Sequence, residues 1–220
     1  MEKTSEGKLL ELATRVLTDD DPCRYVTIDA AYLVGQAKDN QNSVIDRATE
    51  VFHSSFLDGP IEICLAESRF PPERRKYPNF AVDWRQLLIE NEVPPELICS
   101  FRFPEGPVEH TGTEMIGLVE YAKERGWRDI LLIAAPFHQL RSFLSAVMAT
   151  KKVGYPLRIW NLPGSPMPWT ESAVHSQGVQ SGRRSEFIHA ELEKVLTYSA
   201  RGDIATVDEG LEYLNWRVSR

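Results

Sequence analysis

A run of five consecutive apolar residues at positions 130–134 constrains the fold of this chain more than any other feature. The run is too short for a helix, and it has no polar position that would face water from a half-exposed strand. It is typical of a parallel strand that is buried on both faces of a sheet. Pro136 follows at a position where the start of a helix tolerates its missing N–H. We therefore expect a central strand that leads directly into a helix.

Other apolar runs alternate with segments of helical periodicity along the chain. The expected strands are residues 28–34, 61–66, 97–101, 130–134 and 157–160, and the expected helices between them are residues 43–56, 80–92, 111–125 and 136–151. Ser43 is the expected N-cap of the first of these helices, and Thr111 or Thr113 that of the third. Such alternation indicates βαβ units with right-handed crossovers. The sequence thus predicts the α/β class, with a mostly parallel sheet of about five strands and helices on both faces.

The length of 220 residues fits one domain spanning residues 1–220. Residues 1–27 contain an amphipathic helix at 5–17, and residues 28–160 form the sheet core. Residues 161–183 are rich in proline and glycine and predict a long loop, which is usually functional or disordered in a compact domain. Residues 184–220 predict a helical tail with helices at 184–199 and 206–217.

Charge and hydropathy argue against several classes of partner. The net charge is −7 and the pI is near 5.3, whereas a general nucleic-acid binder shows a basic face. No apolar stretch is long enough to cross a bilayer, and the first residues do not resemble a signal peptide. We therefore expect a cytoplasmic protein with no nucleic-acid or membrane partner. The sequence leaves open whether it forms a homodimer.

Neither the cysteines nor the histidines have the spacing of a metal site. Cys23, Cys64 and Cys99 are odd in number and widely separated, so we expect no zinc site and no disulfide framework. Cys64 and Cys99 lie in apolar runs, which predicts buried thiols. The motifs of P-loop enzymes, of ordinary dinucleotide-binding enzymes and of serine hydrolases are missing from the sequence.

Polar residues and glycine follow the expected strands at their carboxyl ends, which meet at one edge of a parallel sheet. Ligands of open α/β sheets bind at this edge. The candidate ligand-binding residues are Gly35, Gln36, Glu67, Ser68, His110, Thr111, Thr113, Pro136 and Arg141, and the candidate catalytic residues are Glu114 and His138. We place the centre of the site at the start of the helix that follows the central strand, where N–H groups and the positive dipole end favour an anion.

Three of these residues carry the expected chemistry. Arg141 is expected to hold a phosphate or carboxylate with its planar guanidinium, although a salt bridge that fixes the helix is the alternative. His138 is a candidate general acid or base, and a structural histidine is its alternative. Glu114 is a candidate base or hydroxyl acceptor, but a carboxylate in the first turn also stabilises a helix without further function.

The remaining candidates also have two interpretations. Thr111 and Thr113 are helix caps first and ligand contacts second. Glu67 and Ser68 suit the hydroxyls of a ribose-like group, or they belong to an ordinary loop surface. Glu191 would reach the site only if the tail helices fold over this edge of the sheet.

Several of these motifs together resemble the YdcF/SanA/ElyC-like family. They are Gly35 after the first strand, Thr111 with Glu114 at the start of a helix, residues 135–141 (Ala-Pro-Phe-His-Gln-Leu-Arg), and a tail with Gly202-Asp203-Ile204-Ala205, Glu209, Tyr213-Leu214 and Trp216-Arg217. The resemblance covers roughly residues 28–217 and points to the cytoplasmic, YdcF-like branch. It implies a Rossmann-like three-layer αβα sandwich and a nucleotide or S-adenosylmethionine as ligand. The chain departs from the family at Glu67-Ser68, where a glycine-rich turn is usual, and at His110, where an asparagine is usual.

Two functions are compatible with these residues. The favoured one is a cytoplasmic hydrolase or group transferase that acts on a small anionic, nucleotide-like or phosphorylated molecule. In it, His138 would handle a proton, Arg141 would hold the anion and Glu114 would assist. The alternative is a non-catalytic sensor that binds an S-adenosylmethionine- or nucleotide-type ligand and signals through residues 161–183.

Overall fold

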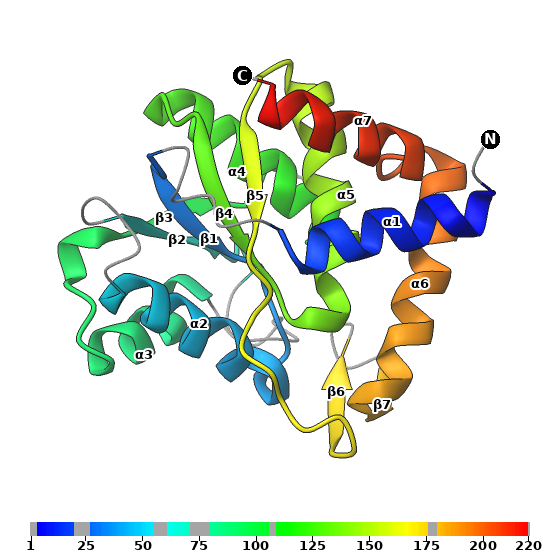
Figure 1. Cartoon of the computed structure of the whole chain (residues 1–220). Helices are drawn as coiled ribbons and strands as arrows, with labels where there is room; N and C mark the ends of the chain where they lie inside the picture. Colours follow the sequence, from blue (N-terminus) through cyan, green and yellow to red (C-terminus); the bar gives the residue numbers. More distant parts are fainter. Residues whose placement is uncertain are drawn as a thin grey trace.

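The computed structural model of the chain describes residues 4–19, 27–54, 61–70, 80–105, 109–175 and 180–219. Cys23, for which the sequence predicts neither a zinc site nor a disulfide, lies outside the described residues. A five-stranded sheet forms the centre of the molecule (Figure 1). Its strands are β1 (Ala30–Leu33), β2 (Glu62–Glu67), β3 (Ile98–Arg102), β4 (Asp129–Ile133) and β5 (Arg158–Asn161).

The sheet has the strand order β3-β2-β1-β4-β5, and every neighbouring pair is parallel. The predicted central strand is β4, and all of its residues are buried. The chain builds one half of the sheet outward from β1 and then crosses back to β4 on the other side of β1. In open α/β sheets, the carboxyl ends of the two strands at such a reversal flank the usual ligand crevice. The fold is therefore α/β and Rossmann-like, as predicted.

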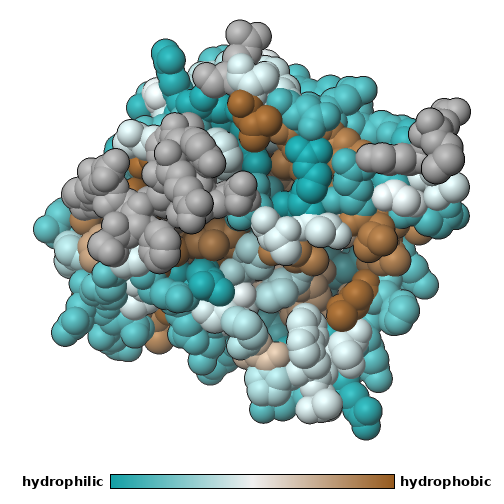
Figure 2. All heavy atoms as spheres, viewed as in Figure 1, coloured by the Kyte–Doolittle hydropathy of each residue, from teal (hydrophilic) through white to brown (hydrophobic). Residues whose placement is uncertain are grey.

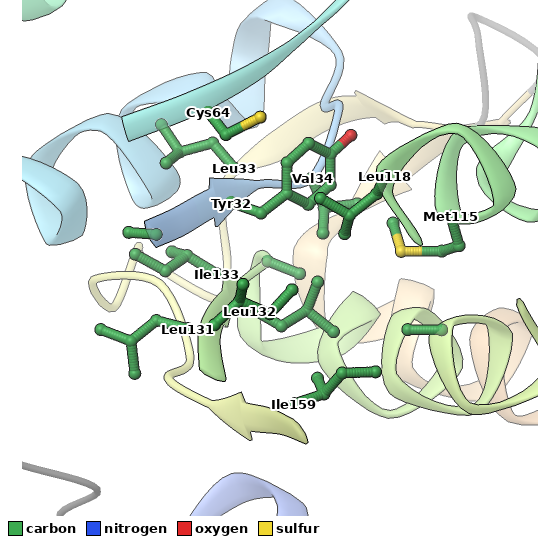
Figure 3. Packing of buried hydrophobic residues seen from close by; sticks show 14 of the residues in the cluster. Tyr32, Leu33, Val34, Cys64, Met115, Leu118, Leu131, Leu132, Ile133 and Ile159 are labelled. Atoms are coloured by element: carbon green, nitrogen blue, oxygen red, sulfur yellow. The ribbon is translucent and has the colours of Figure 1, made fainter. Parts of the chain in front are cut away.

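Helices cover both faces of the sheet (Figure 1). The helices α2 (Gln41–His53) and α3 (Arg85–Glu90) lie on one face, and α4 (Thr111–Arg125) and α5 (Pro136–Val153) lie together on the other. Side chains alternate between the two faces along each strand. In Figure 3, Tyr32 and Leu132 point toward Met115 and Leu118 of α4, whereas Leu33 points the opposite way. Because helices cover both faces, every residue of the central strands β1 and β4 is buried.

The remaining helices pack around α5. They are α1 (Ser5–Leu17), α6 (Arg184–Arg201) and α7 (Val207–Val218), and α1 also contacts α7 (Figure 1). Short helical turns complete the described elements: η2 (Lys38–Asn40), the π-helical η4 (Phe80–Trp84) and η5 (Pro95–Leu97). The helix expected at residues 80–92 is thus π-helical in its first part, and only six residues of it are α-helical.

The expected long loop at residues 161–183 is only partly a loop. Strands β6 (Ser172–His175) and β7 (Gln180–Arg183) form an antiparallel pair outside the main sheet. The side chains of Ala173 and His175 are buried and those of Ser172 and Val174 are exposed, which is the alternation of a half-buried strand. Each strand has four residues, and the prolines and glycines around them concealed this short pattern.

Two expected helix caps are also wrong. Helix α2 begins at Gln41 with Asn40 as its N-cap, and the hydroxyl of Ser43 donates to the carbonyl oxygen of Ser165 at 2.8 Å. Helix α4 is capped by His110, whose Nδ1 accepts hydrogen bonds from the N–H groups of Gly112 and Thr113. An imidazole nitrogen thus has the role that we expected of a threonine hydroxyl.

The prediction of buried thiols holds for Cys64 and only in part for Cys99. On the face that Figure 2 shows, hydrophilic residues predominate and hydrophobic ones lie in separate spots. None of the helices in the described residues has the length and apolar character needed to cross a membrane. Cys64 is buried and Cys99 is half-buried, and both are free thiols.

A buried ion pair ties the carboxyl-terminal helix to the sheet. The guanidinium of Arg217 in α7 donates to both carboxylate oxygens of Asp19 at 2.6 Å and stacks over the ring of Trp160 in β5. The side chains of Asp19 and Arg217 are only 5% and 4% exposed. Asp19 also accepts hydrogen bonds from the backbone and side chain of Asn161. The segment after α1, strand β5 and α7 therefore share one carboxylate.

Replacing Asp19 tests this connection. Asp19→Ala leaves the Arg217 guanidinium buried without its counter-charge, so we expect the free energy of unfolding to fall by about 3–5 kcal/mol. Asp208→Ala is the matched control, because Asp208 pairs with Lys8 while 62% of its side chain is exposed. We expect that change to cost less than about 1 kcal/mol. Urea unfolding of the two variants measures both values. An equal fall in the free energy of unfolding would contradict the role of the Asp19–Arg217 ion pair in holding α7.

Candidate functional site

A cavity of about 590 Å³ opens at the carboxyl ends of the sheet, between the segments that follow β1, β3 and β4. This volume is in the usual range for small-molecule sites. The cavity brings together most of the predicted site residues, namely Gly35, Gln36, His110, Thr111, Thr113, Glu114, His138 and Arg141. The side chains of Phe80, Phe103, Ile116 and Met148 give it apolar walls.

Three predicted residues do not line this cavity. Glu67 forms an ion pair with Arg102 at 3.6 Å, and Ser68 donates a hydrogen bond to Glu109 at 2.8 Å. Pro136 borders a separate, much smaller hollow beside Trp169. The cavity extends along one side of α5 through His138, Arg141 and later residues of that helix. The lining thus includes the first turn of α5, where we placed the centre of the site, and continues along that helix beyond it.

Glu114 is a buried carboxyl group in the first turns of α4. Its side-chain oxygen Oε1 accepts a hydrogen bond from the Tyr32 hydroxyl at 2.6 Å and another from the backbone N–H of Gly35 at 2.8 Å. Figure 3 shows the Tyr32 hydroxyl at the end of a ring that is packed among core side chains. Burial raises the pKa of Glu114 to about 7, because these two hydrogen bonds offset only part of the loss of hydration. The group is poised to gain or lose a proton near neutral pH.

Gly35 has to be a glycine for steric reasons. A Cβ atom at this position would lie 2.4 Å from Cε2 of Phe80, so the backbone passes directly beneath the aromatic ring. In this position the backbone N–H of Gly35 donates to Oε1 of Glu114. The glycine after β1 thus lets the backbone pass close to Phe80 where its N–H bonds to Glu114.

His138 is a buried, neutral imidazole. Its Nδ1 lies 2.9 Å from Nε2 of Gln36, and the same amide nitrogen is 3.4 Å from the carbonyl oxygen of Val34. An amide N–H₂ group only donates, so Nδ1 accepts and the ring proton is on Nε2. Burial and the nearby Arg141 hold the pKa of His138 well below its usual range. Nε2 is buried and has no hydrogen-bond partner among the described residues, so its N–H is an unsatisfied donor at the edge of the cavity.

Arg141 is held in a salt bridge, which was the alternative to an anion clamp. Its Nε lies 2.5 Å from Oε2 of Glu191, its Nη2 lies 3.3 Å from Oε1, and its Nη1 donates to the Thr111 hydroxyl at 3.1 Å. Glu191 belongs to α6, so the tail does fold over this edge of the sheet. The guanidinium lines the cavity, but its charge is balanced by Glu191.

Sequence reasoning missed His175 and Lys194 at this site. His175 of β6 lies with its Nε2 2.9 Å from Oε1 of Glu191, and Lys194 of α6 donates to the same oxygen at 2.8 Å. Burial lowers the pKa of His175. Burial alone would raise the pKa of Glu191, but the charge of Arg141 and the hydrogen bond from His175 hold it well below its usual range. The alternation in residues 172–175 was the one signal that could have placed His175.

These contacts connect the residues at the cavity to one another in a closed series. Thr111 and Glu114 lie one turn apart on α4, and Arg141 connects Thr111 to Glu191. From Glu191 the series continues through His175, whose ring centroid is 5.6 Å from that of His138, then through Gln36 and Gly35 to Glu114. Five segments of the chain thus hold one another in place.

Comparison with known proteins adds no information about this site. No model of a known protein family matches the sequence, and no curated protein matches it either. The resemblance to YdcF-like proteins therefore stays a prediction. Within the described ranges, no group of histidine, cysteine or acidic side chains is arranged to hold a metal ion.

The raised pKa of Glu114 predicts a specific pH dependence of stability. The native state keeps this proton up to about pH 7, whereas the carboxyl of an unfolded chain loses it near its ordinary pKa of 4.5. Stability from Glu114 is therefore complete below pH 4.5 and is lost as the pH rises through 7, by about 3 kcal/mol in total.

Urea unfolding between pH 4.5 and 8 measures this effect as a difference between proteins. The wild-type free energy of unfolding minus that of Glu114→Gln should fall by about 3 kcal/mol across the interval, because the glutamine side chain cannot ionise. The histidines change the stability with pH in the opposite direction, and subtracting one protein from the other cancels their contribution. Glu120→Gln, an exposed position on the same helix, is the control and should show no such trend. A constant difference for Glu114→Gln would show that the carboxyl titrates normally.

Proposed function

We propose that this chain is an enzyme that catalyses hydrolysis or group transfer on a small anionic molecule, nucleotide-like or phosphorylated, at the cavity between β1 and β4. The observation that supports this most is Glu114. Its pKa of about 7 matches the value at which a proton donor or acceptor works best near neutral pH. A buried carboxyl with a perturbed pKa in a cleft is a common mark of an active site.

Glu114 and His138 have complementary chemistry in this proposal. Gly35 contacts Glu114 and the next residue, Gln36, contacts His138, so consecutive residues hold the two groups at the same end of the cavity. Protonated Glu114 can give its proton to a leaving oxygen. The Nε2–H of His138 can donate to an oxygen on which negative charge develops, and a fixed donor in a site with little water stabilises such charge strongly.

The lining favours a ligand with both an anionic and an apolar part. Glu109 is paired with Arg69, and Glu191 is paired with Arg141. With Glu114 protonated, the positive charges of Arg141, Lys152 and Lys194 then exceed the negative charges of Glu191 and Asp203 in this described group, Glu191 being shared by Arg141 and Lys194, which leaves an excess of positive charge. The aromatic and aliphatic walls suit a flat ring such as a nucleobase. A nucleotide or a phosphorylated small molecule meets both conditions.

Glu114→Gln tests the proposal. Glutamine keeps an oxygen for the Tyr32 and Gly35 hydrogen bonds but carries no ionisable proton. For whichever compound of a panel of nucleotides, sugar phosphates and S-adenosylmethionine the wild type converts, we expect kcat to fall at least about 100-fold. The dissociation constant, measured by calorimetry, should change less than about threefold, because the charge of a protonated carboxyl equals that of an amide.

Glu120→Gln again provides the matched control, with unchanged kcat and binding. Full activity of Glu114→Gln would contradict acid–base catalysis by this carboxyl. Tight binding of a panel compound that the wild type never converts would instead support a non-catalytic sensor.

A further inference from the structure

We infer that His175, positioned by Glu191, is the general base of this site, and that it removes a proton from the oxygen that attacks the substrate. The inference rests on the proposed function for its chemistry, but the arrangement of the two side chains is a property of the protein alone. It assigns a role to strand β6, which belongs to the segment expected to be a loop.

The protonation pattern of His175 follows from its partner. Arg141 and Lys194 both donate to Glu191, so Glu191 is a charged carboxylate and can only accept hydrogen bonds. Because Nε2 of His175 is 2.9 Å from Glu191 Oε1, Nε2 must carry the ring proton. The neutral ring then has an unprotonated Nδ1, which receives no hydrogen bond from the described part of the chain. His175 lines the cavity, and we assign this nitrogen as the acceptor of a proton from a bound molecule.

The ring of His175 is held rigidly. It packs edge-on against Phe137, with 5.0 Å between the ring centroids. It also contacts Phe187, whose ring centroid is 5.2 Å away. Together with the hydrogen bond to Glu191, these contacts determine the orientation of Nδ1. A carboxylate that orients an imidazole and balances its charge after protonation is a recurring arrangement in enzymes that activate an oxygen nucleophile. Glu191 touches no reacting atom here, so it is a positioning residue.

The two neighbouring imidazoles are opposite in character. His138 accepts at Nδ1 from Gln36 and presents a donor, whereas His175 donates at Nε2 to Glu191 and presents an acceptor. Their ring centroids are 5.6 Å apart, and both residues line the cavity. The different partners of the two rings thus create a donor and a base side by side from the same residue type.

The proton and electron balance of the reaction is complete with these groups. Nδ1 of His175 takes a proton from water or an alcohol, and the electron pair of that O–H bond stays on the oxygen, which bonds to the electrophilic phosphorus or carbon of the substrate. The bond to the leaving group breaks, its electron pair goes to the leaving oxygen, and Glu114 protonates that oxygen. Solvent then carries the proton from the His175 imidazolium back to the Glu114 carboxylate.

Long-range ¹H–¹⁵N correlation NMR of the ligand-free protein at neutral pH tests the arrangement without any substrate. We expect an unprotonated Nδ1 and a protonated Nε2 for both His175 and His138, assigned with the variants His175→Gln and His138→Gln. The exposed His189 is the reference for a solvated ring. A proton on Nδ1 of His175, or a charged ring, would overturn the inference and leave the case for Glu114 unchanged.

Steady-state kinetics tests whether His175 acts as the general base. His175→Gln keeps a donor for Glu191 but lacks a basic nitrogen, so we expect kcat on the converted panel compound to fall at least about 100-fold, with the dissociation constant within about threefold of wild type. His189→Gln on α6 should behave as wild type. If His175→Gln keeps full kcat while Glu114→Gln loses it, this inference fails and the proposed function stands. If both variants and the wild type lack activity on every compound, the proposed function fails, and the NMR result still decides how His175 is arranged.

Discussion

The ion pair between Arg141 and Glu191 connects the two parts of the chain that form the cavity. Arg141 lies on α5, directly after the central strand, and Glu191 lies on the tail helix α6. Their side chains are 11% and 4% exposed, so both charges have lost most of their hydration. Removing one partner of such a buried pair usually costs about 3–5 kcal/mol, since the other charge is left uncompensated. The pair therefore specifies where the tail docks, and with it the positions of His175 and Lys194.

The same pair changes the electrostatics of the site. An unpaired Arg141 would make the cavity strongly attractive to anions, as the sequence led us to expect. Glu191 is shared by Arg141 and Lys194, so it balances only part of their positive charge, and it also orients the imidazole of His175. The N–H groups at the start of α4 are likewise satisfied within the protein. The N–H groups of Gly112 and Thr113 are satisfied by His110, so the start of α4 offers fewer free donors than its position suggests.

How much could be predicted from the sequence depends on whether a pattern is local. The apolar run of β4 and the polar residues after it are local, and they correctly predicted a buried central strand followed by a helix with His138 and Arg141 on one face. The grouping of Glu114 with these residues followed from the parallel topology, because the segments after β1, β3 and β4 must meet at one edge. The partners of each residue could not be predicted in this way. Glu191 and His175 reach the cavity only through the packing of α6 and β6, which depends on contacts between residues far apart in the chain.

Each ionisable group at the cavity owes its protonation state to a contact with another segment of the chain. Glu114 keeps its proton because β1 and α4 bury it, and the hydrogen bonds from Tyr32 and Gly35 are too few to favour the charged form. Glu191 loses its proton because α5 supplies a guanidinium. The protein thus raises the pKa of one glutamate and lowers that of the other. The histidines between them stay neutral because burial lowers their pKa values. Separation of pKa values among neighbouring groups is how proteins assign acid and base roles to similar side chains. The fold creates that separation here by closing its tail over the end of the sheet.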